Sequence, residues 1–433
     1  MSKMNIPLYQ SLYEDIKDKI IRNDYKKNSK LESVRSLAKR LDISTTTVEK
    51  AYNQLMVEGY IKSIPRSGYI VMDVHILEKE RYRKYIEPID YRKSENNKLT
   101  EDLFDMKPYK ATVNKVFNYQ SEKLYETLDP RGEYELREEI RKYILKERNV
   151  KCDINQIIVG PGIQSLLNIL LSITNKKTVT YLSPEFPKAM NIFRGYGYSL
   201  KPRKSTIEIA RLKADFLYIS PSNTYPTGEV LKAQERNKII KWAHENKSYI
   251  IEDDYNFFFR YNSYSIPAIY SYDDGRSVIY VGSFSKTIIP SIRVSYMVLP
   301  LDLYNIYKGR FMDFSQGVSK LEQLSLAQYM KDGLFQRHIK KLFNLYKEKN
   351  AVMINALTKN NKKKQFKVRG TESNLHVVLD FKGKSSKGVF TRNCDRYYLK
   401  YEEIKKTNSV IFPYSGFTNK EIPKLVKNLF YNM

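Results

Sequence analysis

The sequence has little cysteine, tryptophan and histidine: its 433 residues include two cysteines, one tryptophan and four histidines. Cys152 and Cys394 are too few for a disulfide framework and lack the spacing of metal ligands, so we expect neither. This scarcity is typical of a reducing cytoplasm, where we expect the protein. The sequence also lacks the run of about 18 apolar residues that a membrane span needs, and its first residues lack the apolar core of a signal peptide.

Positive charge is abundant but unevenly distributed. The net charge is +27, yet residues 1–73 hold 13 Lys and Arg against 9 Asp and Glu, a net of +4. Residues 74–110 add +1, which leaves +22 for residues 111–433. This excess indicates chiefly a lysine-rich solvated surface, and the alternative is a field that attracts phosphates without sequence specificity.

Residues 7–73 have the pattern of a helix-turn-helix followed by a two-stranded wing. Apolar spacing predicts a first helix over about 8–23 and a second one capped by Ser33. Ser44 or Thr45 caps a third helix, which ends before Gly59. Short strands at 60–63 and 68–71 enclose the loop 64–67, the wing. We therefore predict a DNA-binding domain over residues 1–73.

DNA recognition needs donors for phosphates at a helix N-terminus and small polar side chains in the major groove. The third helix offers both at its start, although Tyr52 also falls on its apolar face with Val48 and Leu55. The second helix and the wing contribute further candidates. The predicted DNA contacts are Arg35, Ser44, Thr45, Thr46, Thr47, Lys50, Tyr52, Arg66 and Gly68.

Residues 74–107 are rich in charges of both signs and poor in apolar residues, which predicts a linker, with one helix near 76–86. From 108 onward, helical patterns alternate with short apolar strands near 157, 178, 216, 249, 278 and 294. This alternation predicts an α/β domain with a mainly parallel sheet over about 108–310. Residues 311–433 indicate long helices and a smaller α+β part, with strands at 375–379 and 410–412.

Lys286 is the strongest candidate for covalent chemistry. It follows the apolar strand 278–281, with Ser283 and Ser285 before it and Arg293 seven residues after it. A lysine amine in such a place can form a Schiff base with the aldehyde of pyridoxal phosphate. The two hydroxyls and the guanidinium suit the phosphate dianion.

Three further segments supply candidate ligands of the same cofactor. Gly162, Ile163 and Gln164 lead from a strand into a helix, where free amides attract a phosphate. Phe186 could stack on the ring, although a core aromatic is an equal alternative. Asp253 and Tyr255 have the same parity after a buried strand, so they face one side, with Asp253 at the ring nitrogen and Tyr255 at the ring hydroxyl. We expect no metal.

Residues 31–71 resemble the winged-helix domains of GntR-type regulators, and the segments around Asp253 and Lys286 resemble fold-type-I aminotransferases. Together they resemble the MocR subfamily, whose members join an N-terminal winged helix to an aminotransferase-like domain. The resemblance implies that Lys286 carries pyridoxal phosphate, that Arg293 binds its phosphate and that Asp253 binds its ring nitrogen. It also implies a homodimer and control of vitamin B6 or amino-acid metabolism.

The sequence departs from these families at several positions. Glu32 and Thr45 replace a proline and an arginine of the winged-helix pattern. Asn223 and Tyr225, which we also assign to the cofactor site, lie in a loop where aminotransferases place an asparagine directly before Pro-Thr-Gly; here that position holds Tyr225. The stretch 405–413 contains no arginine to clamp a substrate carboxylate.

These features favour a transcription regulator that binds a double-stranded DNA operator and senses either pyridoxal phosphate itself or its adduct with an amine or amino acid. The missing arginine favours the vitamer itself. One alternative is a working aminotransferase with an accessory DNA-binding domain. The other is a DNA-binding protein whose large domain serves only for dimerisation.

Overall fold

The computed structural model describes residues 7–73, 103–183, 187–261, 266–289, 291–361, 363–373, 376–397, 399–404 and 407–430. The chain divides into two compact units, Met1–Asp90 and Tyr91–Met433. Among these described residues, no helix has the combination of length and apolar character that crossing a membrane requires. The helix expected near 76–86 lies outside them.

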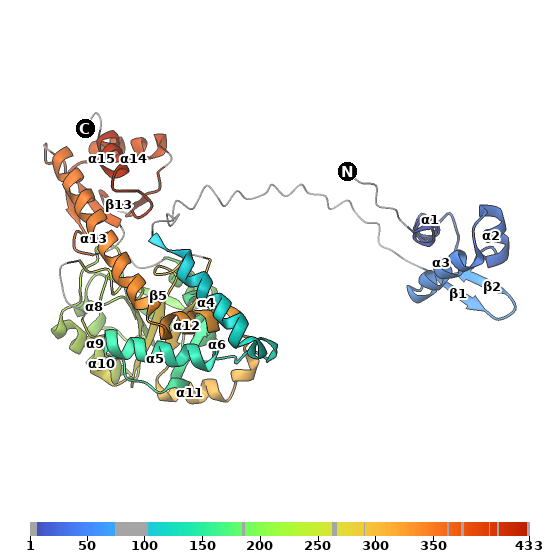
Figure 1. Ribbon diagram of the computed structural model, residues 1–433, viewed down its shortest axis with the longest axis horizontal. Coiled ribbons are helices and arrows are strands. Elements are labelled where there is room, and N and C mark those ends of the chain that lie inside the picture. Colours follow the sequence, from blue (N-terminus) through green and yellow to red (C-terminus); the bar gives the residue numbers. More distant parts are fainter. Residues whose placement is uncertain are drawn as a thin grey trace. The chain divides into compact units, whose positions relative to one another are not determined.

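The first unit is a helix-turn-helix with a β-wing (Figure 1). Ser33 caps the second helix by accepting a hydrogen bond from the Ser36 amide, and Ser44 caps the third by accepting one from the Thr47 amide. Both caps fit the prediction. Its elements are α1 (Leu8–Ile21), α2 (Val34–Leu41), α3 (Thr45–Val57) and the antiparallel strands β1 (Ile61–Ile64) and β2 (Gly68–Val71).

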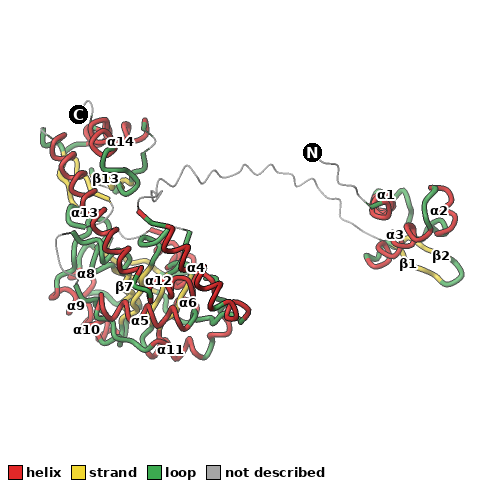
Figure 2. Tube along the Cα trace, viewed as in Figure 1, coloured by secondary structure: helices red, strands yellow, loops and turns green. Residues whose placement is uncertain are grey.

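The second unit is built on a seven-stranded sheet, counted over the described residues, with helices on both faces (Figure 2). The strand order is β3-β9-β8-β7-β6-β4-β5, and only the pairs that include β9 are antiparallel. The mainly parallel sheet is therefore confirmed. The strands are β3 (Ile157–Gly160), β4 (Thr178–Leu182), β5 (Ser199–Arg203), β6 (Phe216–Ile219), β7 (Tyr249–Asp253), β8 (Val278–Ser283) and β9 (Ser295–Val298).

Alternating residues of these strands enter two separate apolar cores. Ile250 belongs to one core and Ile251 to the other, as the two-residue period of a strand requires. The helices of this part are α4 (Met106–Tyr119), α5 (Tyr134–Arg148), α6 (Ile163–Ser172), α7 (Pro187–Gly195), α8 (Thr206–Ala210), α9 (Ala233–Asn246), α10 (Tyr270–Asp273), α11 (Leu301–Lys308) and α12 (Lys320–Lys331), with 3-10 turns η3 (Ser121–Tyr125), η4 (Ile154–Gln156) and η5 (Phe311–Asp313).

The long helix α13 (Leu334–Asn360) leads from this sheet to a smaller α+β part (Figure 1). That part has its own apolar core, which includes Met353 and Phe412. Its elements are β10 (Phe366–Arg369), β11 (His376–Phe381), α14 (Lys384–Arg396), β12 (Glu402–Glu403), β13 (Ser409–Pro413) and α15 (Glu421–Leu429), and its strands are all antiparallel in the order β10-β11-β13-β12.

Two expected boundaries differ from the structure. Leu103 and Phe104, which we placed in the linker, are buried in the second unit. The large part continues past residue 310, because α12 packs against α4 and α5 and contributes Leu326 and Met330 to the core of the large sheet. Packing rather than local pattern decides this boundary.

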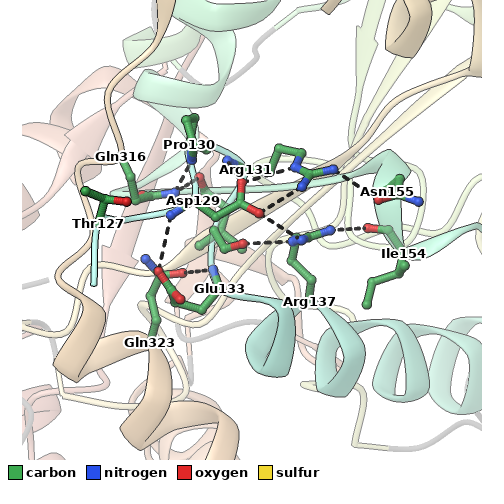
Figure 3. A network of polar contacts seen from close by, with 12 residues as sticks. Thr127, Asp129, Pro130, Arg131, Glu133, Arg137, Ile154, Asn155, Gln316 and Gln323 are labelled. Atoms are coloured by element: carbon green, nitrogen blue, oxygen red, sulfur yellow. Dashed lines mark hydrogen bonds and ion pairs between the residues drawn. The ribbon is translucent and has the colours of Figure 1, made fainter. Parts of the chain in front are cut away.

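A polar network fixes the segment before α5 against strand β3 (Figure 3). Asp129 accepts hydrogen bonds from Arg131 at 2.9 Å and 3.1 Å and from Arg137 at 3.2 Å. Arg131 also donates to Asn155 at 3.0 Å, and Gln316 donates to the carbonyls of residues 130 and 159. The network holds β3 in place, and β3 leads directly into the glycine turn discussed below.

Candidate functional site

Lys286 lies in a tight turn that directly follows β8. The amides of Thr287 and Ile288 donate to the carbonyl of Phe284 at 2.9 Å and 3.1 Å. His338 from α13 lies with its Nε2 2.6 Å from the carbonyl oxygen of Thr287. The backbone of the turn is thus anchored, while the side chain of Lys286 remains accessible.

The surroundings of Lys286 favour its neutral form. Although the side chain keeps accessible surface, the protein atoms around it restrict hydration of the ammonium group and lower its pKa. The positive charges of Lys400, Lys188 and Arg293 lower this pKa further. A neutral amine is the nucleophilic form, so the environment suits covalent chemistry at this nitrogen.

The register of the sheet brings most of the predicted cofactor ligands to one edge. Asp253 ends β7 and lies beside Val281 of the parallel strand β8, whose chain continues to Lys286. Gly160 and Ser283 both pair with Ser295 of β9, so the ends of β3 and β8 lie at the same level. Four segments distant in sequence therefore meet at the carboxyl edge, where ligands bind in open α/β sheets.

Asp253 is 2% exposed, and its two carboxylate oxygens differ. The Tyr218 hydroxyl donates to Oδ2, whereas Oδ1 is buried without a hydrogen-bond partner among the described residues. Burial raises the pKa of this carboxyl to about 7. Asp254 points the other way, toward Arg148 and Tyr280, which confirms the parity argument for these two aspartates.

Asn223 presents a second unsatisfied group near this edge. It is 2% exposed, and both its Oδ1 and its Nδ2 lack a hydrogen-bond partner within the described part of the chain. The Tyr255 hydroxyl lies 3.4 Å from its carbonyl oxygen, which places Tyr255 beside the same loop. Buried polar atoms normally have partners, so Asn223 and Asp253 fit a bound group with a ring nitrogen and a ring hydroxyl.

Tyr225 lies differently from expectation. Its hydroxyl donates to Oε2 of Glu402 in β12 at 2.7 Å, and its ring meets the His376 ring edge-on at 6.0 Å. The hydroxyl is therefore engaged with the C-terminal part of the chain. The ring-hydroxyl contact stays a prediction for Tyr255, which lies beside Asn223.

A cradle for an anion lies at the N-terminus of α6. Gly162 precedes this helix with φ of 117°, and among the described residues no side chain caps the helix there. A Cβ on Gly162 would lie 2.9 Å from Nη2 of Arg293, so only glycine allows the guanidinium this close. Arg293 also donates to the Ser285 hydroxyl at 3.2 Å, and the Ser285 amide donates to the Ser283 hydroxyl at 3.2 Å. Helix amides, a guanidinium and hydroxyls together fit a phosphate dianion.

Two other predicted residues belong to this cradle, and one cannot be placed. Ile163 and Gln164 form the first turn of α6, with Ile163 half-buried against the apolar core and the Gln164 side chain exposed. Their contribution to an anion site is their backbone amides. Phe186 lies outside the described residues, as do Leu375, Lys405 and Lys406.

Sequence reasoning missed two residues at this site. Tyr218 is a buried phenol in the otherwise apolar strand β6, and that single polar atom was its only signal. His376 of β11 has its Nε2 2.7 Å from the Pro226 carbonyl oxygen. Burial lowers the pKa of His376, and the charge of Lys286 lowers it further, so the C-terminal part reaches the surroundings of Lys286.

The winged helix presents most of its predicted DNA contacts at the surface. Arg35, Thr45, Thr46 and Lys50 are exposed on α2 and α3. Ser44 and Thr47 are engaged with each other, with 2.8 Å between their hydroxyl oxygens, at the N-terminus of α3. In the wing, Arg66 is exposed with φ of 63°, and Gly68 has φ of 96°. This arrangement fits a recognition helix with a flanking wing.

Tyr52 does not fit a DNA contact. Its side chain is 1% exposed, and its hydroxyl donates to the backbone carbonyl of Glu32 at 3.0 Å. Its ring packs edge-on against Tyr69 of β2, with ring centroids 4.7 Å apart. The prediction was wrong for this residue because the apolar face of α3 is turned toward the core.

The described residues contain no group of three or more His, Cys, Asp or Glu arranged to hold a metal ion.

Residues 8–71 match the family model described as bacterial regulatory proteins, gntR family, and residues 94–418 match aminotransferase class I and II. The second match covers most of the chain.

Several transcriptional regulators are similar to this chain over most of its length. The uncharacterized HTH-type transcriptional regulator YdeL of Bacillus subtilis is 34% identical over 98% of this chain and 96% of its own length. The HTH-type pyridoxine biosynthesis transcriptional regulator PdxR of Corynebacterium glutamicum is 25% identical over 85% and 82%. The "probable rhizopine catabolism regulatory protein MocR" of Rhizobium meliloti is 25% identical over 81% and 77%.

Solved structures show the fold of the second unit. The α-aminoadipate aminotransferase LysN of Thermus thermophilus superposes with a TM-score of 0.66 at 20% identity and covers 76% of this chain and 88% of its own. At this identity the likeness establishes the fold-type-I architecture and not the activity.

Proposed function

The chain belongs to the GntR-type transcriptional regulators that carry a class I aminotransferase domain, the MocR subfamily, and we propose that it senses its cofactor through Lys286. It is a DNA-binding regulator that depends on pyridoxal phosphate. The observation that carries the proposal is the meeting of Lys286, Asp253, Asn223 and Arg293 at one edge of the sheet.

The roles of these residues follow from their chemistry. The cofactor supplies an aldehyde and an electron-withdrawing ring. Lys286 would hold the cofactor covalently, since its Nζ as a neutral amine is the group that can condense with an aldehyde, both of its hydrogens leaving with the aldehyde oxygen as water. Asp253 pairs with the protonated ring nitrogen, and Asn223 and Tyr255 hold the ring hydroxyl.

The phosphate is held by the cradle at α6. Arg293 supplies charge-assisted hydrogen bonds, and the N-terminal amides of the helix supply further donors. The hydroxyls of Ser283 and Ser285, next to Arg293, are the remaining proposed donors to the phosphate. The proposed phosphate ligands are Arg293, Ser283, Ser285, Gly162, Ile163 and Gln164.

The signal is proposed to be the vitamer itself. The stretch 405–413 has no arginine for bidentate binding of a carboxylate, and a lysine replaces that planar fork poorly. One relative is named as a regulator of pyridoxine biosynthesis, which supports a vitamin B6 signal. An amine or amino acid that joins the cofactor is the second candidate, and the cations Lys188 and Lys400 near Lys286 favour one that carries a carboxylate.

The DNA partner is proposed to be an operator bound by a homodimer in the cytoplasm, where bacterial chromosomes lie. Two winged helices in one dimer fit two half-sites of a duplex.

The test is the visible absorbance of protein loaded with pyridoxal phosphate, followed by borohydride reduction and peptide mapping. We expect an absorbance band and a reduced adduct on the peptide that contains Lys286. The Lys286→Ala variant should lose that adduct, and the control Lys188→Ala, which changes a neighbouring cation, should keep it. An adduct on another lysine, or none, would contradict the proposal.

A further inference from the structure

Asp253 and Asn223 present their unpaired atoms at the ends of two neighbouring parallel strands. Asp253 ends β7, and Asn223 follows β6, its neighbour in the sheet. A bound ring needs the carboxylate and the amide at a defined separation, because hydrogen bonds weaken quickly with distance and angle. Something must therefore fix the two backbones relative to each other.

One buried guanidinium contacts the sequence neighbours of both groups. Arg148, the last residue of α5, is 1% exposed. Its Nε donates to Oδ2 of Asp254 at 2.6 Å, and its Nη2 donates to the Ser222 hydroxyl. Asp254 directly follows Asp253, and Ser222 directly precedes Asn223.

The guanidinium itself is fixed from other directions. Its Nη1 donates to the carbonyl of Ile266, and its Cζ lies over the Phe257 ring, 4.9 Å from the ring centroid. The Tyr280 hydroxyl donates to the same Asp254 oxygen at 2.7 Å. All three nitrogens of Arg148 are used, which a lysine with one nitrogen cannot reproduce.

Asp254 and Asp253 point to opposite sides, so Arg148 cannot itself contact a group bound by Asp253. We propose that Arg148 is a positioning residue: by joining Asp254 to Ser222, it sets the separation of the Asp253 carboxylate and the Asn223 amide. This inference rests on the proposed binding of pyridoxal phosphate at these two residues.

A second buried arginine provides a matched control. Arg236 is also 1% exposed, but it donates only to backbone carbonyls, those of Leu231, Pro267 and Pro221, at 2.9 Å, 2.6 Å and 3.3 Å. Its loss should destabilise the fold as the loss of any buried, hydrogen-bonded arginine does. Within the described part of the chain it has no hydrogen bond to Asp254 or Ser222, although its contact at Pro221 lies one residue before Ser222.

The experiment compares Arg148→Lys, Ser222→Ala and Arg236→Lys in the full-length protein. The readouts are the dissociation constant for pyridoxal phosphate, the pH at which the visible absorbance of the loaded protein changes, and the thermal midpoint of the cofactor-free protein. Ser222→Ala removes one contact and leaves the buried ion pair intact, so it should fold even if Arg148→Lys does not.

We expect Arg148→Lys to weaken cofactor binding about 10-fold or more, which corresponds to the loss of one buried charge-assisted hydrogen bond. Its absorbance transition should move to higher pH, because looser pairing with Asp253 leaves less positive charge on the ring. Ser222→Ala should change both readouts in the same direction with little change in the thermal midpoint. Arg236→Lys should lower the midpoint and leave both cofactor readouts as in the wild type.

The positioning role would be overturned if Ser222→Ala and folded Arg148→Lys both kept the cofactor affinity and the pH profile of the wild type. It would also be overturned if Arg236→Lys lost as much cofactor affinity as Arg148→Lys. These outcomes are separate from failure of the proposed function. In that case the wild-type protein itself would show no adduct at Lys286, whatever the variants do.

Discussion

At the scale of single residues, Asp253 carries a charge that depends on its surroundings. Burial raises its pKa to about 7, well above the value of about 3.9 that is usual for aspartate. Between these pH values the native state binds more protons than the unfolded state, so the free energy of unfolding falls as the pH rises from about 4 to 7. Pairing with a cationic ring nitrogen removes the cost of the buried charge.

The Asp253→Asn variant should therefore show a flatter pH dependence of its urea midpoint between about pH 4 and pH 7 when cofactor is absent. Glu252, whose pKa burial and Asp254 raise to about 7, titrates in the same range, and we assign the remaining slope to it. Urea unfolding of wild type and variant at each pH provides the measurement. Parallel curves for the two proteins would mean that Asp253 does not titrate there.

Substitutions at two residues of α3 test DNA contact and core packing separately: Lys50 is exposed, and Tyr52 is buried. Lys50→Ala should weaken binding to all DNA sequences alike and reduce the salt slope by about one, because one phosphate contact is lost. Tyr52→Phe should lower the free energy of unfolding by about 1 kcal/mol through its lost hydrogen bond to Glu32, with operator affinity unchanged. Operator titrations at several salt concentrations measure the first effect. A loss of affinity in folded Tyr52→Phe equal to that in Lys50→Ala would restore Tyr52 as a contact.

At the scale of elements, the turn from β3 into α6 should decide between phosphorylated and unphosphorylated vitamers. Gly162→Ala places a Cβ 2.9 Å from Nη2 of Arg293 and strains a residue with φ of 117°. We expect the ratio of affinities for pyridoxal phosphate and pyridoxal to fall by about 10-fold or more, which equals about 1.4 kcal/mol. Gly195→Ala is the control, since no atom lies within 4 Å of its added Cβ. An unchanged ratio in Gly162→Ala would place the phosphate elsewhere.

The elements themselves were largely predictable, with one omission. Apolar runs identified the strands from β3 to β9 except β5, whose residues Ser199–Arg203 are mostly accessible because the strand lies at the sheet edge. Pro202 is tolerated there for the same reason. A strand with only one neighbour needs no continuous apolar run, so the pattern gave no signal.

Contacts between elements were less predictable than the elements. Parity separated Asp253 from Asp254, because it depends only on the local period of a strand. The Tyr218–Asp253 hydrogen bond and the approach of His376 to Lys286 depend on register and on packing between distant segments. Neither leaves a trace in the local sequence, and the same holds for the place of α12 in the large core.

At the scale of the whole molecule, the two units have separate tasks. The winged helix holds the DNA contacts with a modest net charge of +4 in residues 1–73, so specificity there depends on placed side chains more than on a general field. The second unit holds the cofactor site. A cofactor can alter DNA binding only if its affinity differs between two arrangements of the protein.

The most direct test of this account is operator affinity measured with and without pyridoxal phosphate, for wild type and for Lys286→Ala. The account predicts that the cofactor changes the operator dissociation constant of the wild type and leaves that of the folded variant unchanged at the same cofactor concentration. Identical dissociation constants in all four measurements would contradict it.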